Sequence, residues 1–430
     1  MDRTMDEQRC KVEFPAFYDQ IENNVRAWQA KGGITLKDVD DAQFGAADGW
    51  GFARIIIKDG QLYIREVREG NESRMSALLH LLYQAVTTDP SSARGGGEGS
   101  LPAIDMVIST ADKDGIAAPA GWVMDKRVDE DPRNGRWLVP DFGFAGWPEA
   151  GIASYEEFLL LADKEERDHS WEKKDSRAFW RGFANFYATR KDLLQRTSLT
   201  INPSRSTWSD VRETSFHDVG EQFSEIVPMH EHCRRKYLIH SEGNSYSGRS
   251  KYLLACHSVT IAHPLEWTQH FHPALNSDPT SPEQNIVQLP GPLFNGLEEE
   301  VLRLREMDKS GLGTSQGKVT PLSQNSARRI ADNARQVLRQ RYLTPAATMC
   351  YTRAALKAYA SVQEVKTWPE SKIDGLRGPS PKDGPGGGVV PSGGKGKDML
   401  KLGAKGDIEY GIWRLTGSID WPPGPRMRRG

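Results

Sequence analysis

The sequence predicts an α/β protein, and three observations support that prediction. Short β-branched runs such as IIIK and MVIS alternate with longer segments whose apolar residues recur at helical spacing. Several of these runs end in polar or glycine-containing turns, which is where α/β proteins bind ligands. The 430 residues also provide enough chain for about two or three domains.

The elements can be placed in order along the chain. Asp59–Gly60 is the turn of an expected hairpin over 53–66, because it separates a β-branched run from an alternating one. Helices are expected over 11–30, 74–86, 154–166, 187–198, 247–257, 296–308, 326–343 and 346–365. Further strands are expected over 104–110, 177–183, 236–243 and 258–263. Residues 309–324 are expected to form a loop, and the Gly/Pro-rich segment from 373 onward a disordered tail.

Composition excludes several functional classes. Lys and Arg (56) nearly balance Asp and Glu (58), so the chain has no field for general nucleic-acid binding. Apolar runs such as FLLLA are far shorter than the ~18–20 residues of a membrane span, which excludes a multi-pass membrane protein. The start, MDRTMDEQRC, carries charges where a signal peptide needs an apolar core. Taken alone, it indicates a cytosolic chain or one whose natural beginning is missing.

The four cysteines are Cys10, Cys233, Cys256 and Cys350. They allow three pairings, and composition does not choose among them. No CxxC or Cys/His zinc spacing is present.

The strongest local signal is the segment KYLIHSEGNSYSGRSKYLLAC, in which a strand meets a turn and then a helix. The turn comprises Gly243, Asn244, Ser245, Tyr246, Ser247, Gly248, Arg249 and Ser250. It is one residue from the phosphate-binding pattern G-x-x-x-x-G-K-[ST], with Arg249 where that pattern needs lysine. Small residues, backbone N–H groups and a guanidinium fork favour a diphosphate. The alternative is an ordinary turn with a surface arginine.

Other candidate groups are weaker. Arg181 and Arg190 flank a second strand–turn–helix unit and could face the same ligand. Asp112-Lys113-Asp114 and Asp129-Glu130-Asp131 fit the acidic D-x-D pattern of metal-dependent glycosyltransferases, but Asp112 at a strand end is better placed as a lone general base. MHEHC and QHFHP suggest metal ligands without a second ligand pair. Several indoles could stack on a sugar or simply fill the core: Trp122, Trp137, Trp147, Trp171, Trp180 and Trp267.

Three segments resemble one family. WPEAGIASYEEFL, HSWEKKDSRAFWRG and the block from His232 to Leu275 are similar to the CAP10 domain of glycosyltransferase family 90. That family includes fungal capsule-associated xylosyltransferases and animal protein O-glucosyltransferases. The resemblance runs with gaps from about Cys10 to Val362, and FPAFYDQIENNVRAW looks like the fungal branch.

The resemblance implies a GT-B fold, in which two Rossmann-like domains face a nucleotide-sugar cleft. The implied boundaries are 10–165, completed by a helix over 345–365, and 166–344, with 373–430 as the tail. It further implies an inverting, metal-independent transfer of xylose or glucose from a UDP-sugar to a glycan or glycoprotein, with no cofactor. Asp112 matches the catalytic base, Arg190 and Asn244 through Arg249 match the nucleotide-sugar site, and Phe183 matches a uridine-side contact. Trp147, Pro148 and Glu149 match the acceptor side.

The same resemblance pairs Cys10 with Cys350 and Cys233 with Cys256. Such bridges need an oxidising compartment. The expected location is therefore the lumen of the endoplasmic reticulum or Golgi, and the missing signal is attributed to a truncated start that could also carry any membrane anchor.

Three other readings stay open at this stage. A metal-dependent transferase of another fold would use a D-x-D pair. A glycoside hydrolase would use paired carboxylates and need no phosphate site. A catalytically inactive, carbohydrate-binding member of the family would keep the fold without the reaction.

Overall fold

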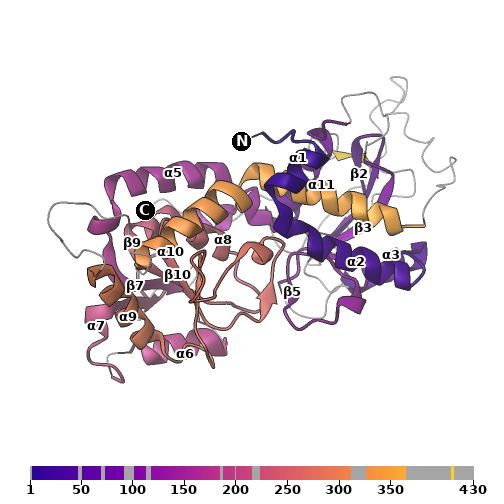
Figure 1. Ribbon diagram of the computed structural model, residues 1–430. Coiled ribbons are helices and arrows are strands. Elements are labelled where there is room, and N and C mark those ends of the chain that lie inside the picture. The colour runs from indigo at the N-terminus through magenta and orange to yellow at the C-terminus, as the bar shows by residue number, and fades with distance from the viewer. Residues whose placement is uncertain are drawn as a thin grey trace, which may run out of the picture.

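The computed structural model describes residues 2–46, 51–68, 73–91, 101–112, 118–184, 187–198, 200–215, 223–310, 326–364 and 408–410. Helices surround two main sheets that lie side by side, which confirms the α/β prediction (Figure 1). The helices are α1 (Glu7–Glu13), α2 (Tyr18–Ala30), α3 (Leu36–Ala46), α4 (Ser73–Thr87), α5 (Tyr155–Asp168), α6 (Ala188–Arg196), α7 (Arg205–Trp208), α8 (Ser250–Leu254), α9 (Leu297–Ser310), α10 (Ala327–Asn333) and α11 (Pro345–Val362).

The strands are β1 (Phe52–Lys58), β2 (Gln61–Arg68), β3 (Ile104–Ser109), β4 (Trp122–Val123), β5 (Lys126–Arg127), β6 (Trp137–Leu138), β7 (Asp175–Gly182), β8 (Ser209–Glu213), β9 (Arg235–His240), β10 (Val259–Ala262), β11 (Trp267–Thr268), β12 (Val287–Gln288) and β13 (Ile408–Glu409). The expected hairpin is β1–β2, and its turn residues Asp59 and Gly60 have φ of 51° and 72°. These positive values fit the asparagine- or aspartate-glycine turns that close two-residue hairpins.

The first sheet has the order β13-β2-β1-β3-β4-β6 and is mixed. β1 is antiparallel to both β2 and β3, whereas β3, β4 and β6 run parallel. A hairpin forces antiparallel pairing, so this half of the protein differs from a wholly parallel Rossmann sheet at β1 and β2. The carboxyl end of β3 leads directly to Asp112.

The second sheet is parallel throughout and has the order β12-β10-β9-β7-β8. In chain order within this half, the strands lie 2-1-3-4-5 from β8 to β12. That order reverses direction between β7 and β9, and α/β proteins bind ligands in the crevice at such a switch point. β8, with the sequence SDVRE, was not expected from the sequence because an edge strand with one polar face lacks an apolar run.

Two helices, α11 and α5, pack across the expected boundary between the two halves of the chain. α11 returns from the second half and packs on the first sheet (Figure 1). There the Tyr359 ring lies 5.3 Å from that of Trp122. α5 packs instead against the second half, since Arg234 donates to both carboxylate oxygens of Glu165 at 2.6 and 2.9 Å. The structure therefore places α5 on the far side of the boundary expected at residue 165. Below, the N-terminal half means the first sheet with its helices and α11, and the C-terminal half means the second sheet with its helices and α5.

Both expected disulfides are present. Cys10 and Cys350 join α1 to α11 across 340 residues, and Cys233 and Cys256 join the segment before β9 to the end of α8 across 23 residues. No cysteine remains free. The pairing that the resemblance implied is confirmed.

We expect replacement of Cys233 and Cys256 by serine together to lower the free energy of unfolding by about 3 kcal/mol, because the open chain regains the conformational freedom of the closed loop. Urea denaturation of the double variant and of the wild type measures the change. As a control, the wild type is also unfolded in a reducing buffer that opens its disulfides. A change below about 0.5 kcal/mol, within the range of an ordinary surface substitution, would contradict the prediction.

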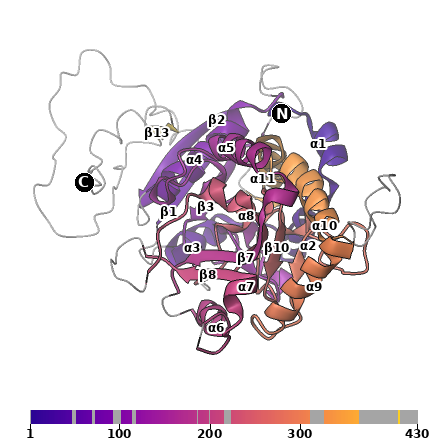
Figure 2. The same cartoon turned by 90° about the vertical axis from the view of Figure 1, so that its left-hand side faces the viewer.

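The tail expected to be disordered contains three residues, 408–410, that the structure describes. Most of 373–430, and most of the loop expected over 309–324, lie outside the described residues. Within the tail, however, β13 pairs antiparallel with β2 (Figure 2). The Tyr410 ring lies 4.7 Å from that of Tyr83. In the described ranges, no helix combines the length and apolar character needed to cross a bilayer.

Candidate active site

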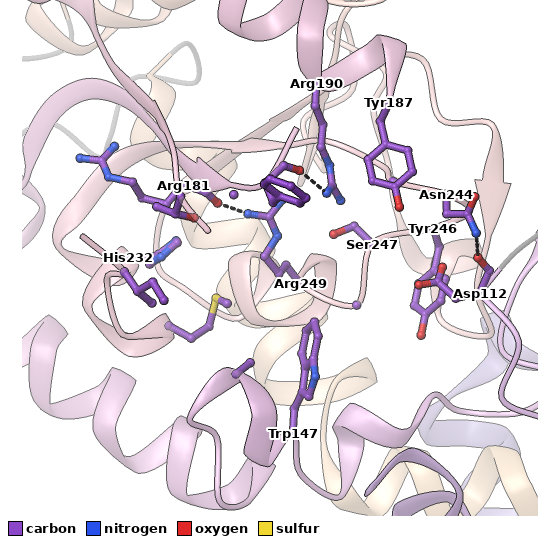
Figure 3. Close-up of a pocket in the computed structure, with 18 of the residues that line it drawn as sticks. Asp112, Trp147, Arg181, Tyr187, Arg190, His232, Asn244, Tyr246, Ser247 and Arg249 are labelled. Carbon is purple, nitrogen blue, oxygen red and sulfur yellow. Dashed lines mark hydrogen bonds between the residues drawn. The ribbon is translucent and has the colours of Figure 1, made fainter. Parts of the chain in front are cut away.

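A cavity of about 230 Å³ lies between the two halves, beside the carboxyl ends of β7 and β9 (Figure 3). The N-terminal half contributes Arg74, Asp112, Phe142, Trp147 and Ala150. The C-terminal half contributes Arg181, Gly182, Phe183, Tyr187, Arg190, Thr214, Ile226, Val227, Met229, His232, Gly243, Asn244, Tyr246, Ser247, Gly248 and Arg249. The cavity therefore occupies the switch point of the parallel sheet, which is the position that the strand order favours.

Two guanidinium groups face this cavity. Arg249 donates to the carbonyl oxygen of Arg181 and lies over the Trp180 ring at 5.4 Å. Arg190 donates to the carbonyl oxygens of Glu242 and Phe183 at 3.0 and 2.8 Å. Among the described residues, neither arginine has a carboxylate within ion-pair distance. Burial, together with the nearby Arg190, lowers the pKa of Arg249 to about 9, so an anion in the cavity would stabilise both charges.

Two glycines make room for these arginines. A Cβ atom on Gly243 would lie 2.7 Å from Nη2 of Arg190, and one on Gly182 would lie 2.9 Å from Nη1 of Arg249. Both separations are shorter than real Cβ contacts, so a side chain at either position would displace the guanidinium group. Gly182 ends β7 and Gly243 follows β9. The guanidinium groups of Arg249 and Arg190 therefore pack directly against the backbone at the ends of the two strands that flank the switch point.

Asp112 lies at the opposite end of the cavity from His232 (Figure 3). Its Oδ1 accepts a hydrogen bond from Ser245 Oγ at 2.8 Å, its backbone oxygen accepts one from Asn244, and Nη1 of Arg74 lies 3.6 Å from its Oδ2. The side chain is 28% exposed, so an incoming hydroxyl can reach it. Burial raises the pKa of Asp112, while Arg74, Ser245 and Arg190 act in the opposite direction.

Of the WPE segment, only the tryptophan lines the cavity. The Trp147 indole lies opposite Arg190 and approaches Gly248, where an added Cβ would be 3.4 Å away (Figure 3). Glu149 turns to the first residue of α4, because its carboxylate accepts from the backbone N–H and the hydroxyl of Ser73 at 3.1 and 2.9 Å. Glu149 thereby caps α4 next to Arg74, and Pro148 is not among the residues that line the cavity.

The wall near Phe183 is apolar. Phe183 is 37% exposed, its ring lies 6.3 Å from that of Phe223, and Ile226 and Met229 continue the surface. His232 lines the same wall, and burial lowers its pKa to about 3, so the imidazole is neutral. This wall suits a planar, uncharged group beside the charged arginines.

The other groups that suggested metal ligands are used differently. Asp129, Glu130 and Asp131 each pair with an arginine, respectively Arg127, Arg136 and Arg133. Cys233 of MHEHC is in a disulfide, and His270 of QHFHP is buried among aromatic rings. Within the described ranges, no cluster of three or more His, Cys, Asp or Glu side chains is arranged to hold a metal ion. Asp114, the second residue of the other D-x-D pattern, lies outside the described residues.

The structure brings most of the expected site residues together. Asp112, Trp147, Phe183, Arg190, Asn244, Tyr246, Ser247, Gly248 and Arg249 all line the cavity, and Ser245 lies directly behind it. Of the six indoles considered, the other five are buried and do not line the cavity, although Trp180 lies beneath the guanidinium of Arg249. Sequence reasoning missed Arg74 and Tyr187, which carry no motif. It considered His232 only as a candidate metal ligand within MHEHC. Arg181, noted from the sequence, also lines the cavity.

Comparison with known proteins gives one family. The model of glycosyl transferase family 90 matches residues 8–280. Protein O-glucosyltransferase 1 of Homo sapiens is 25% identical over 218 residues, which are 47% of this chain and 51% of that protein. The protein of the same name from Rattus norvegicus is 28% identical over 148 residues, 32% of this chain and 36% of the relative. O-glucosyltransferase rumi of Drosophila melanogaster is 23% identical over 290 residues, 64% of each. The chain thus spans about half of the human relative and less than two thirds of the fly one.

Proposed function

The chain belongs to glycosyl transferase family 90, and from that membership we propose that it is a UDP-sugar-dependent, inverting glycosyltransferase acting on a hydroxyl of a glycan or glycoprotein. The cavity supports the proposal, because it offers one region of positive charge, one apolar wall and one carboxylate. These are the features that a diphosphate, a uracil ring and an attacking hydroxyl would respectively need.

The single observation that carries the proposal is the pair Arg190 and Arg249. Their guanidinium groups face one cavity at the switch point and, among the described residues, bond only to backbone carbonyl oxygens. Arginine binds phosphate oxygens through two parallel N–H groups, and two such forks match the two phosphates of UDP. A glycoside hydrolase would have no use for this pair.

Asp112 is the proposed general base. It removes the proton of the acceptor hydroxyl while that oxygen attacks the anomeric carbon, and UDP leaves from the opposite face, which inverts the configuration. Arg74, 3.6 Å from Oδ2, favours the ionised carboxylate that this role requires. The backbone carbonyl of Asp112 accepts from Asn244, so the base is tied to the turn that borders the two arginines.

The departing UDP gains negative charge, and Arg190 and Arg249 would stabilise it in place of a divalent cation. The sequence also suggested a contribution from the helix that begins after Gly248. That helix, α8, has five residues, and its dipole is correspondingly small. The arginines therefore carry most of the proposed stabilisation.

The proposed fold is GT-B, with the N-terminal half on the acceptor side and the C-terminal half on the donor side. Asp112 and Trp147 come from one half, and both donor-side arginines from the other. A reaction that needs both halves would be protected from water when they close on the substrates.

The sugar is proposed to be glucose or xylose. The relatives reported above are named as O-glucosyltransferases, and the human and rat ones as protein O-glucosyltransferases, which favours glucose and a protein hydroxyl. The fungal resemblance favoured xylose and a glycan. Two disulfides support a proposed location in the lumen of the secretory pathway.

A donor screen tests the proposal. UDP release is measured from UDP-glucose, UDP-xylose, UDP-galactose and UDP-glucuronate, each with a glycoprotein and with a mannan acceptor, and each with and without EDTA. We expect release that depends on one donor and one acceptor and that survives EDTA. Release of sugar from the acceptor without any nucleotide would identify a hydrolase, and loss in EDTA with recovery in Mn²⁺ would identify a metal-dependent enzyme.

We expect Gly243→Ala to raise the KM for the donor about tenfold, because the new methyl group would displace the Arg190 fork, and a hydrogen bond to a charged group contributes roughly 1.5 kcal/mol or more. Initial rates at varied donor concentration measure it. Gly248→Ala serves for comparison, because its Cβ would meet nothing nearer than 3.4 Å. This variant should therefore raise KM less than Gly243→Ala does. An equal or larger shift for Gly248→Ala would contradict the argument.

A further inference from the structure

A second carboxylate, Asp125, lies behind Asp112, and one hydroxyl joins the two. Ser245 Oγ is 2.8 Å from Oδ1 of Asp112 and 2.6 Å from Oδ2 of Asp125. A serine hydroxyl has one proton and can donate to only one of them. The other contact is a hydrogen bond only if one of the two carboxyl groups is itself protonated.

The surroundings decide which carboxyl holds that proton. Asp112 is partly exposed and faces Arg74 and Arg190, which favour its ionised form. Asp125 is 4% exposed, and among the described residues no arginine or lysine lies within ion-pair distance of it. Two ionised carboxylates sharing one buried hydroxyl would repel each other. The proton therefore belongs on Asp125, and burial accordingly raises its pKa to about 7.

We propose that Asp125 is a positioning residue that stays neutral, donates to Ser245 and thereby commits the single Ser245 proton to Asp112. The inference rests on the proposed role of Asp112 as the base. With Oδ1 of Asp112 held by Ser245, Oδ2 remains for the acceptor hydroxyl. The Asp125 proton is not consumed, since the proton of the acceptor goes to Asp112.

The neutral form also matters for the donor. Ser245 and Tyr246 belong to the turn that carries Arg249, and the backbone N–H of Tyr246 points to Oδ2 of Asp125 at 3.3 Å. An ionised Asp125 would place a negative charge beneath the proposed diphosphate site and would compete with Asp112 for the Ser245 proton. Both effects would slow transfer once Asp125 loses its proton.

Other ionisable groups surround Asp125. Asp112 faces it from the end of β3, Arg136 from the segment before β6, and Tyr246 and Glu242 from the turn after β9. Burial raises the pKa of Glu242 to about 8, so Glu242 titrates in the same range. Any test must therefore compare the wild type with variants of Asp125 that keep Glu242.

The test compares Asp125→Asn with the near-isosteric Asp125→Leu across pH 5.5–9. Wild-type kcat/KM should fall as pH rises above about 7. Asp125→Asn cannot ionise and keeps an N–H donor, so its kcat/KM should lack this fall and should be about fivefold lower at pH 6, the loss expected for one weakened neutral hydrogen bond. Asp125→Leu removes the hydrogen bond to Ser245, so the Ser245 proton is no longer committed to Asp112. Its kcat/KM should be about 10- to 100-fold lower at every pH. Ser245→Ala should remove the difference between the Asp125 variants.

A second readout is independent of activity. The folded-state pKa of Asp125, about 7, is above its unfolded value, so the stabilisation is fully present at pH below about 4 and is lost as pH rises through 7. The Tm of the wild type relative to Asp125→Asn should therefore fall between pH 4.5 and 8. Parallel Tm curves, or the same pH–rate profile for both proteins, would overturn the positioning role while leaving the proposed function intact. No transfer by the wild type from any donor would overturn the proposed function, and the positioning role with it.

Discussion

Replacement of Asp112 by asparagine should lower kcat for sugar transfer by about 10²- to 10⁴-fold, the contribution of a well-placed general base. Asparagine keeps the size of the side chain and can still accept from Ser245, but its amide cannot take a proton from the acceptor hydroxyl. UDP release with donor and acceptor at saturation measures the loss. Because the amide does not titrate, the variant should lack the fall in activity that the wild type shows when Asp112 is protonated at low pH, and the loss should be largest where Asp112 is ionised.

Two controls separate lost chemistry from lost structure. UDP binding to Asp112→Asn, measured by calorimetry, should stay within about threefold of wild type, because the two arginines proposed to bind the diphosphate remain. Asp129→Asn changes an aspartate whose side chain is 73% exposed in the same half and should leave kcat within about twofold. If Asp112→Asn transfers sugar at the wild-type rate, Asp112 is not the base.

Replacement of Arg249 by alanine should lower kcat/KM for the donor by about 10²- to 10³-fold, the loss measured when one preorganised donor to a developing charge is removed. The effect should divide between donor binding and kcat, because the diphosphate carries charge in the ground state and gains more as UDP leaves. Initial rates over a range of donor concentrations, together with UDP calorimetry, measure both parts.

Arg249→Lys tests geometry separately from charge. Lysine restores one positive charge but not the planar fork, so it should recover only part of the lost activity. Arg212→Ala is the matched control, since Arg212 lies in the same half with its side chain 59% exposed. We expect it to change kcat/KM by less than about twofold. Equal losses for Arg212→Ala and Arg249→Ala would mean that the effect is one of general charge and not of a phosphate site.

Much of the fold could be predicted because it depends on near neighbours. The β1–β2 hairpin follows from a β-branched run and an Asp59–Gly60 turn, and α4, α5 and α9 follow from apolar residues at helical spacing. Strands of two residues, such as β4 and β6, could not be predicted, since two residues establish no period. α8 is shorter than expected because the chain enters it from a tight turn and leaves it at Cys256, which is fixed by a disulfide.

The candidate site could be predicted in part for the same reason. The segment from Gly243 to Arg249 is continuous in sequence, so its composition alone indicated an anion site. Arg74 and Asp125 could not be found in this way. Arg74 lines the cavity from the first turn of α4, whose first residue is bound by Glu149, distant in sequence. Asp125 contacts the site through the hydroxyl of Ser245 and the backbone N–H of Tyr246, which lie 120 and 121 residues further along the chain.

The sequence by itself determined the alternation of helices and strands and singled out one turn as a candidate phosphate site. Through its resemblance to a family, it also implied the disulfide pairs and the candidate base. These depend on residues that are close along the chain or on a pattern shared with relatives. The tertiary structure alone decided that Arg190, Arg249 and Asp112 face one cavity, that Glu149 serves a helix cap, and that a hydroxyl joins two carboxylates. The physical reason is that side chains far apart in the sequence meet only when the order of strands and the packing of two halves bring their backbones together.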